Sequence, residues 1–419
     1  MFLWMQWEGF SEMDKKCIVL KKVLKKQTKI LTLFFHGKQL VKASVEEETG
    51  RLLGRIYLAK VKDIVKNIQA AFVEIQPGVR CFLSLQDIYA PFLLNRTYDG
   101  RLLVGDELLV QVKKEAMGTK PPSVTCQLAL DGKYGVLSLG KPGIAYSSRL
   151  SAKVKTRIGT GLANYPLQQL QSYGIVIRTN AKELAEDMTP LWEELCELAQ
   201  RMEELQKAAS FRTCFSLLHE KLPTYLTALR DLQAEDYSEI ITDNLDIFQK
   251  IEDFSQKHPQ FGLPALRLYE DSLLPLEQLY GIRHRLQEAL NRRVWLKSGG
   301  YLMIEPTEAL TVIDVNSGKI GTKKKPQETY VKVNHEAAEE IARQLTLRNL
   351  SGIIIVDFIS MEQEEERRKL LAYFGDLLKK DRIRTQLVGM TTLGLVEVTR
   401  MKISSPLWEQ LEGWNADIS

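Results

Sequence analysis

Residues 307–318 read TEALTVIDVNSG, and residues 351–361 read SGIIIVDFISM. Each contains an apolar run, typical of a buried strand, that stops at an aspartate: Asp314 in the first and Asp357 in the second. The segment between them, NHEAAEEIARQLTLRNL at residues 334–350, is predicted to be a helix. A strand, a helix and another strand in succession predict neighbouring strands in one sheet that helices cover. Both carboxylates are then expected at the same edge of that sheet.

The paired carboxylates indicate a metal ion. Two carboxylates that lie close together repel each other unless a cation lies between them. Hard oxygen ligands favour Mg²⁺ or Mn²⁺, and Mg²⁺ commonly takes one or two carboxylates together with waters and phosphate. Asn316 follows Asp314 by two residues, so on a continuing strand it shares that face and can orient water or phosphate. The alternative is that each aspartate only caps the next turn or helix.

The neighbouring residues extend this α/β block. Residues 301–318 contain two strand-like runs, and EQEEERRKLLAYFGDLLKKD at residues 362–381 is predicted to be a helix. LVGMTTLGLVEVTR at residues 387–400 is predicted to close the block with one more strand. The basic residues of GKIGTKKKPQ, which directly follow the Asp314 strand, either track a phosphate backbone or form a solvated loop: Lys319, Lys323, Lys324 and Lys325.

The first half of the chain is richer in strands. TKILTLFFHGKQLVKASVE at residues 28–46 predicts a β-hairpin. From Gly50, short β-branched runs separated by Gly, Pro and Asn predict a small closed barrel such as an OB-fold. QSYGIVIRTNAKE at residues 171–183 predicts a buried strand followed by a helix, and TPLWEELCELAQRMEELQK at residues 189–207 predicts an amphipathic helix.

Two groups in this half can contact nucleic acid. Phe72 and Phe82 lie on consecutive strand runs, where barrel aromatics stack bases; burial inside the barrel is the alternative. Arg178 and Thr179 lie between a strand and a predicted helix, where a guanidinium, a hydroxyl and free backbone amides suit a phosphate. The alternative is a local salt bridge of Arg178 and a helix cap by Thr179.

Composition limits the classes of protein. The chain has 419 residues and a net charge of only +4, so nucleic-acid binding has to come from local patches. The five cysteines form no CxxC pair, which argues against a disulfide framework or a cysteine zinc site. No stretch is apolar enough to span a bilayer, and residues 1–12 resemble no secretory signal, so a cytoplasmic protein is expected. Those first residues are interpreted as a disordered extension or a misassigned start.

Several long segments, in this order, resemble the motifs of the ribonuclease E/G family. The resemblance covers nearly the whole chain after about residue 28, and its segments are GRIYLAKVKDIVKNIQAAFVEI, GIVIRT, LYED, GIRHRLQEAL, TEALTVIDVNSG, NHEAAEEIARQL, SGIIIVDFISM and LGLVEVTR. It implies a multidomain α/β fold in which an OB-fold barrel and a 5′-sensor module are inserted into a ribonuclease-H-like domain. A deoxyribonuclease-I-like catalytic α/β domain follows.

The resemblance also implies domain boundaries. They are an N-terminal extension (1–27), the first ribonuclease-H-like part (28–46), the OB-fold RNA-binding domain (47–127), the 5′-sensor domain (128–225), the second ribonuclease-H-like part (226–289), the deoxyribonuclease-I-like catalytic domain (290–403) and a C-terminal tail (404–419).

Residue roles follow from the same resemblance. Asp314 and Asp357 would bind the catalytic Mg²⁺, and Asn316 would support that catalytic site. The residues expected to contact RNA are Phe72, Phe82 and Lys120. Those expected to hold a 5′-monophosphate are Arg178 and Thr179, aided by the backbone of Gly132 and Val136.

The function implied is a Mg²⁺-dependent endoribonuclease, with Mn²⁺ as a substitute, that cuts single-stranded RNA during rRNA and mRNA processing and decay. Its products would carry 5′-phosphate and 3′-hydroxyl ends, and 5′-monophosphorylated RNA would be preferred. Two rivals remain: a non-catalytic OB-fold RNA-binding protein, and a metal phosphoesterase acting on DNA or a small nucleotide. The family usually has a paired-cysteine zinc link after its final strand, but no cysteine follows Thr399. We therefore expect no structural zinc, and any homodimer would not be bridged by zinc.

Overall fold

A computed structural model describes residues 14–24, 27–48, 52–89, 91–116, 120–232, 237–318 and 326–412. They belong to two compact units. The first unit comprises residues 1–48, 233–257 and 263–419, and the second comprises residues 49–232 and 258–262. The suggested extension at residues 1–12 and the lysines of the basic loop at residues 319–325 lie outside the described residues.

A five-stranded sheet in the first unit combines strands from both sides of the insertion. In spatial order the strands are β15 (Ala265–Leu268), β14 (Glu239–Thr242), β1 (Lys15–Leu24), β2 (Gln27–His36) and β3 (Gln39–Glu47). The antiparallel pairing of β2 with β3 confirms the predicted hairpin. The expectation that an extension runs to residue 27 is wrong, because β1 pairs along its whole length with β2 and lies parallel to β14. Its apolar residues 17–20 are fully buried, as a central strand requires.

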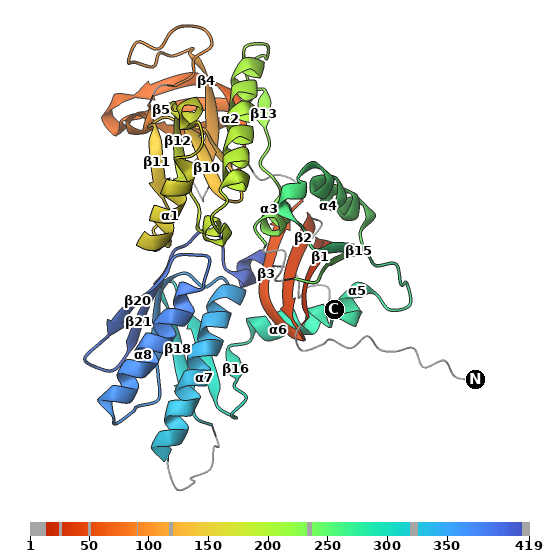
Figure 1. Ribbon diagram of the computed structural model, residues 1–419, viewed down its shortest axis with the longest axis vertical. Helices are drawn as coiled ribbons and strands as arrows, with labels where there is room; N and C mark the ends of the chain where they lie inside the picture. The colour runs from red at the N-terminus through yellow and green to blue at the C-terminus, as the bar shows by residue number, and fades with distance from the viewer. Residues whose placement is uncertain are drawn as a thin grey trace. The chain divides into compact units, whose positions relative to one another are not determined.

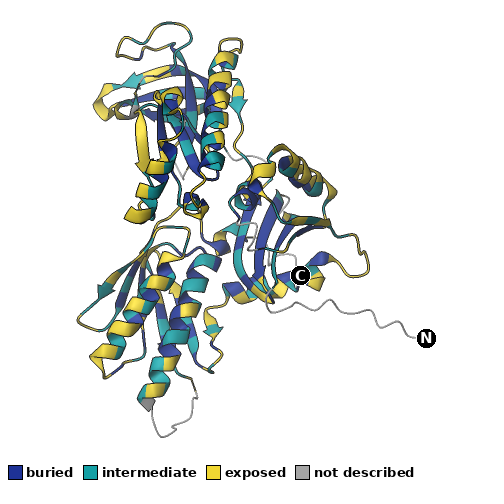
Figure 2. Ribbon diagram, viewed as in Figure 1, coloured by how far each residue is buried: buried dark blue, intermediate teal, exposed yellow. Residues whose placement is uncertain are grey.

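Four helices accompany this sheet. They are α4 (Leu245–Lys257), α5 (Leu276–Leu279), α6 (Ile282–Leu290) and α9 (Leu407–Gln410). Leu276, Leu286 and Leu407, from three of them, share one core with Ile18 and Leu33 of the strands. Figure 2 shows these strands as mostly buried.

The second unit begins with a closed barrel. Its strands are β4 (Ile56–Val65), β5 (Ala70–Gln76), β6 (Val79–Ser84), β8 (Ser123–Thr125) and β7 (Glu107–Lys114), with β13 (Leu217–His219) added beside β4. Pairing of β4 with β7 closes the barrel, which confirms the expected OB-like architecture at this coarse level. Alternate side chains such as Val73 and Leu83 fill its interior and are fully buried.

A four-stranded sheet with flanking helices completes this unit. The strands, in order, are β11 (Gly143–Tyr146), β12 (Tyr173–Ile177), β10 (Gly135–Leu139) and β9 (Ala129–Asp131), and the helices are α1 (Ala152–Leu162), α2 (Thr189–Ala209) and α3 (Thr224–Arg230). The predicted helix at 189–207 is confirmed, and Leu191, Leu195 and Met202 are buried along it. The helix predicted after β12 is wrong. Only a 3₁₀ turn, Thr179–Glu183, forms there, because the next residue, Leu184, is extended and buried in the core.

The α/β sheet of the first unit is six-stranded. Its order is β16 (Arg293–Trp295), β17 (Tyr301–Pro306), β18 (Leu310–Asn316), β19 (Gly352–Asp357), β21 (Val396–Arg400) and β20 (Thr385–Met390). The helices α7 (Pro326–Leu347) and α8 (Glu364–Lys379) lie side by side on it (Figure 1). One strand was expected at residues 387–400, but the chain forms a hairpin, because Thr391–Leu395 turns with Gly394 at φ 88°.

Side chains on β18 and β19 alternate between two environments. Ile313, Val315 and Val356 lie in the core that α7 and α8 cover. Asp314 and Asp357 therefore point to the opposite face of the sheet. None of the helices in the described part of the chain combines the length and apolar character needed to cross a membrane.

Arg400, at the end of β21, has a side chain only 2% exposed, and its charge is compensated inside the protein. Its Nε donates to Asp381 at 2.7 Å, and its Nη1 donates to the side-chain oxygen of Asn349 at 2.8 Å and to the carbonyl of Leu350 at 2.9 Å. A buried guanidinium with this set of acceptors holds the end of the sheet to the segment before β19.

Replacing Asp381 with alanine would leave this guanidinium buried without its counter-charge. We expect the free energy of unfolding of Asp381→Ala to fall by about 3–5 kcal/mol, measured by urea denaturation. Asp376→Ala is the control, because its ion pair with Lys379 is exposed, and it should change stability by less than about 1 kcal/mol. Equal losses of unfolding free energy in both variants would contradict the claim that the buried pair of Arg400 with Asp381 stabilises the fold more than the exposed pair does.

Candidate functional site

Asp314 and Asp357 are partners in the parallel pairing of β18 with β19. Paired residues on adjacent strands point to the same face, and the strands lie about 4.8 Å apart. The predicted proximity of the two carboxylates at one sheet edge is therefore confirmed. Asp314 is half-buried and Asp357 is exposed, so the pair is open to solvent.

Asn316 lies on the same face of β18 as Asp314. Its side-chain amide donates a hydrogen bond to Oδ2 of Asp314 at 2.7 Å. This contact orients the carboxylate and leaves its Oδ1 oxygen available to a ligand. By this geometry Asn316 acts on the site through Asp314.

The donor set fits a hard divalent cation. Within the described part of the chain, neither Asp314 nor Asp357 has a cationic partner, and neither accepts a hydrogen bond from a backbone N–H as a capping residue would. Two adjacent carboxylates repel each other, and a cation between them would stabilise both. The described residues contain no cluster of three or more His, Cys, Asp or Glu side chains suited to a metal. Waters and a phosphate would therefore supply the remaining ligands, which is the usual situation for Mg²⁺.

Phe72 and Phe82 face outward from the barrel. They are directly opposite each other on β5 and β6, with ring centroids 6.2 Å apart in an edge-to-face arrangement. Both side chains are partly exposed, whereas their strand neighbours are buried, so the alternative of two core aromatics is not supported. The Arg80 guanidinium lies 5.6 Å from the Phe72 ring centroid and adds positive charge beside this aromatic pair.

Lys120 is exposed and lies close in sequence to a contact with the aromatic strand. The carbonyl of Pro122 accepts a hydrogen bond from the backbone N–H of Phe82 at 2.8 Å. The segment that carries Lys120 is thereby tied to β6, on the same barrel as the two phenylalanines.

Arg178 and Thr179 follow β12 and both have partners inside the second unit. The guanidinium of Arg178 makes a two-pronged ion pair with Asp231, at 2.8 and 3.2 Å, and also donates to the carbonyl of Gly132. The hydroxyl of Thr179 lies 3.0 Å from that of Ser147 and makes no helix cap. The local salt bridge considered for Arg178 is therefore present, while the cap considered for Thr179 is not.

The fold brings Gly132 and Val136 to these residues. A Cβ at Gly132 would overlap the carboxylate of Glu194, so the chain needs a glycine there. The Gly132 N–H donates to the carbonyl of Gly135 at 2.8 Å. Val136 is opposite Val176 in the antiparallel pairing of β10 with β12, and β9 pairs with β10 on its other side. The four residues expected at the 5′ end thus lie around one end of this sheet.

Comparison with known proteins identifies the family of this chain. A model of the ribonuclease E/G family matches residues 129–403. The chain belongs to the ribonuclease E/G family. It is 35% identical over 363 residues to ribonuclease E of Nostoc sp., covering 85% of this chain and 52% of that protein. Ribonuclease E of Synechocystis sp. is 35% identical over 379 residues, with 89% and 55% coverage. Ribonuclease G of Escherichia coli is 32% identical over 389 residues, with 88% and 77% coverage.

This ribonuclease E/G family member spans about half the length of those two ribonucleases E. The family match begins in the sheet of the second unit and includes both Asp314 and Asp357. The geometry of the carboxylate pair is therefore part of the matched region, whereas the barrel strands before residue 129 lie outside the family model's match.

Two residues near the sites were not anticipated from the sequence. Asn334 is fully buried on α7, and its side chain exchanges two hydrogen bonds with the backbone of Ile359, at 2.8 and 3.0 Å. It anchors the segment that directly follows Asp357. The sequence does place Asn334, a polar residue, on the apolar face of the predicted helix, and this could have indicated a buried structural role. His335, beside it, packs against the Tyr373 ring with centroids 5.0 Å apart.

Asp231 is the second unanticipated residue, and two arginines share its carboxylate. Its oxygens pair with Arg178 and with Nε of Arg230 at 2.9 Å. Burial alone would raise the pKa of Asp231, but the positive charges of Arg230 and Arg178 outweigh burial and hold the pKa below its ordinary value. Only the folded chain brings Arg178 to a carboxylate so distant in sequence.

Proposed function

We propose that this chain is a Mg²⁺-dependent endoribonuclease that cuts single-stranded RNA and leaves 5′-phosphate and 3′-hydroxyl ends. The observation that carries the proposal is the in-register placement of Asp314 beside Asp357 on an open sheet face. Membership of the ribonuclease E/G family favours RNA as the substrate over DNA or a small nucleotide.

Asp314 and Asp357 would hold the metal ion through their carboxylate oxygens. When bound there, Mg²⁺ supplies an activated water and offsets negative charge on the phosphoryl oxygens. Asn316 would keep Asp314 in its binding orientation through the 2.7 Å hydrogen bond. Asn334 would keep the segment after Asp357 in place through its two hydrogen bonds with Ile359. These contacts hold both carboxylates before substrate arrives.

The outward aromatic pair on the barrel would hold single-stranded RNA by stacking. Phe72 and Phe82 present partly exposed rings, and stacking tolerates any base sequence because every base has a π-face. Arg80 and Lys120 would add attraction for the phosphate backbone from the same barrel. Together these groups favour a polymeric substrate.

The end of the second unit's small sheet would hold a 5′-monophosphate. Asp231 occupies part of the Arg178 fork, so phosphate would contact the remaining guanidinium N–H groups and the Thr179 hydroxyl. A monophosphate carries more charge than an internal phosphodiester and has free oxygens for such donors. The proposed gain is in alignment of the substrate, since these residues belong to a different unit from the carboxylate pair.

The metal-site proposal is tested by Asp314→Asn and Asp357→Asn. Each is expected to slow cleavage of a single-stranded RNA by roughly a thousandfold or more in Mg²⁺, because it removes a metal ligand worth several kcal/mol. RNA affinity and the urea midpoint should be unchanged, and Asp376→Asn on the exposed face of α8 is the control. Near-normal turnover of either variant would refute the assignment. Cleavage of single-stranded DNA instead, or RNA binding without any cleavage by the unmutated chain, would favour the rival functions.

The barrel proposal is tested by Phe72→Ala and Phe82→Ala. Each should weaken binding of a 5′-hydroxyl single-stranded RNA roughly ten- to a hundredfold, because one stacked base contributes about 1–3 kcal/mol. Phe211→Ala is the matched control, since Phe211 is 89% exposed, lies just after α2 and belongs to none of the barrel strands. An equal loss of RNA affinity at all three positions would show that Phe72 and Phe82 form no specific RNA-binding site.

The 5′-end proposal is tested best by Thr179→Val, because this change keeps the shape and removes only the hydroxyl. It should slow cleavage of 5′-monophosphorylated RNA roughly tenfold, while 5′-hydroxyl RNA is cut at the original rate. Arg178→Ala should act in the same direction but also lower stability, since Asp231 loses a partner. Urea denaturation of Asp231→Asn, compared with the unmutated chain, measures how much stability is lost when the ion pair of Arg178 with Asp231 is broken. Equal slowing of both RNAs by Thr179→Val would leave Arg178 and Thr179 with a structural role alone.

A further inference from the structure

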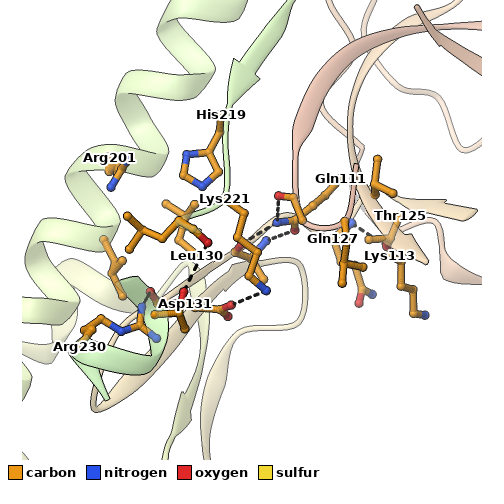
Figure 3. Close-up of a pocket in the computed structure, with 17 residues that line it drawn as sticks. Gln111, Lys113, Thr125, Gln127, Leu130, Asp131, Arg201, His219, Lys221 and Arg230 are labelled. Atoms are coloured by element: carbon orange, nitrogen blue, oxygen red, sulfur yellow. Dashed lines mark hydrogen bonds and ion pairs between the residues drawn. The ribbon is translucent and has the colours of Figure 1, made fainter. Parts of the chain in front are cut away.

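A pocket of about 370 Å³ lies within the second unit, and one of the residues that line it is Arg230, the partner of Asp231 (Figure 3). Barrel residues, including Lys113 of β7 and Thr125 of β8, form one side of it. Arg201 of α2, His219 of β13 and Arg230 of α3 form the other side. The volume is in the range of pockets that hold small molecules, roughly 300–1,000 Å³.

The lining of the pocket is positively charged. Four cationic side chains line it: Lys113, Arg201, Lys221 and Arg230. Among the described residues that line it, Asp131 is the single carboxylate, and it pairs with Lys221 at 3.4 Å. Figure 3 shows Lys221 and Arg230 both directed toward Asp131. The surplus of positive charge favours an anionic ligand.

Arg230 lines the pocket and carries a buried donor that has no acceptor among the described residues. Its side chain is only 4% exposed. Nε donates to Asp231 at 2.9 Å and Nη1 donates to the carbonyl of Asp131 at 2.6 Å. Nη2 is buried and has no hydrogen-bond partner among the described residues. An unsatisfied buried donor is costly, so an acceptor atom that reached Nη2 would stabilise it.

His219 adds a neutral polar group to the same wall. Burial, reinforced by the charges of Arg201 and Lys221, lowers the pKa of His219 to about 4, although the carboxylates of Asp131 and Glu220 oppose this shift. At neutral pH its ring therefore offers a hydrogen bond without a charge. An anion bound beside it would raise its pKa, so the ring reports on occupancy.

We propose that this pocket binds a phosphate-bearing ligand about the size of one nucleotide, with the phosphate held by Arg230, Arg201 and Lys221. The ligand is either a free mononucleotide or one nucleotide of an RNA chain, which share the phosphate group. The side-chain amide of Gln127 and the hydroxyl of Thr125, on the opposite side, offer hydrogen bonds to the rest of the ligand. The inference rests on this wall of the second unit and does not depend on the carboxylate pair or on RNA cleavage.

The test is calorimetric titration of the full 419-residue chain, without Mg²⁺, with inorganic phosphate, 3′-AMP and a 5′-hydroxyl oligoribonucleotide. Arg201→Gln and Lys221→Gln should each weaken binding roughly tenfold or more, because each removes a charge-assisted contact. Lys207→Gln is the matched control on the same helix, since Lys207 is 77% exposed and does not line the pocket. It carries the same change of charge and should leave affinity unaltered.

A second measurement locates the ligand. The NMR signals of the His219 ring, assigned by comparison with His219→Gln, should shift on saturation. A shift with 3′-AMP assigns a free nucleotide, whereas a shift with the oligoribonucleotide alone assigns an RNA phosphate, and both support the pocket. The proposal is overturned if no probe binds, or if Lys207→Gln weakens binding as much as Arg201→Gln. It is also overturned if binding survives Arg201→Gln but disappears in Thr179→Val, which would place the phosphate at the 5′-end residues.

Discussion

Backbone pairing between the parallel strands β18 and β19 sets Asp314 opposite Asp357. Side chains alternate along a strand, so a slip of one residue would turn one of the two carboxylates into the core. The helices α7 and α8 prevent such a slip, because Ile313, Val315 and Val356 fill the core beneath them. Hydrophobic burial on one face of the sheet therefore specifies the position of charge on the other.

The second unit organises charge differently. Asp231 pairs with both Arg178 and Arg230, so one carboxylate compensates the charge of two guanidinium groups that lie at different sites. Arg178 lies at the end of the small sheet, and Arg230 lines the cationic pocket. Each arginine keeps donors that Asp231 does not use. Such sharing holds cations in place for anionic ligands at a lower cost in desolvation than unpaired buried charges would carry.

In the closed barrel, the inward side chains form the core and the outward side chains are available to contact a ligand. Its five strands pair into a ring, with β4 joined to β7, so one side chain in two points inward. Val73, Cys81 and Leu83 fill the interior. Phe72 and Phe82 point outward and therefore do not contribute to the packing of the barrel interior. A partly exposed pair of large aromatic rings leaves apolar surface open to a ligand, which agrees with the stacking role proposed for the pair.

The sequence by itself determined the local elements and the chemistry at their ends. The β2–β3 hairpin, the amphipathic α2 and the β18–α7–β19 succession follow from periodicity, which neighbouring residues carry. The aspartates after two apolar runs were visible for the same reason. Only the tertiary structure decided the rest. β1 became a central strand because β2 and β14 pair with it, and burial of Leu184 limited the segment after β12 to a 3₁₀ turn. The ion pair of Arg178 with Asp231 and the hydrogen bond from Arg230 to the carbonyl of Asp131 join residues distant along the chain, which packing alone brings together.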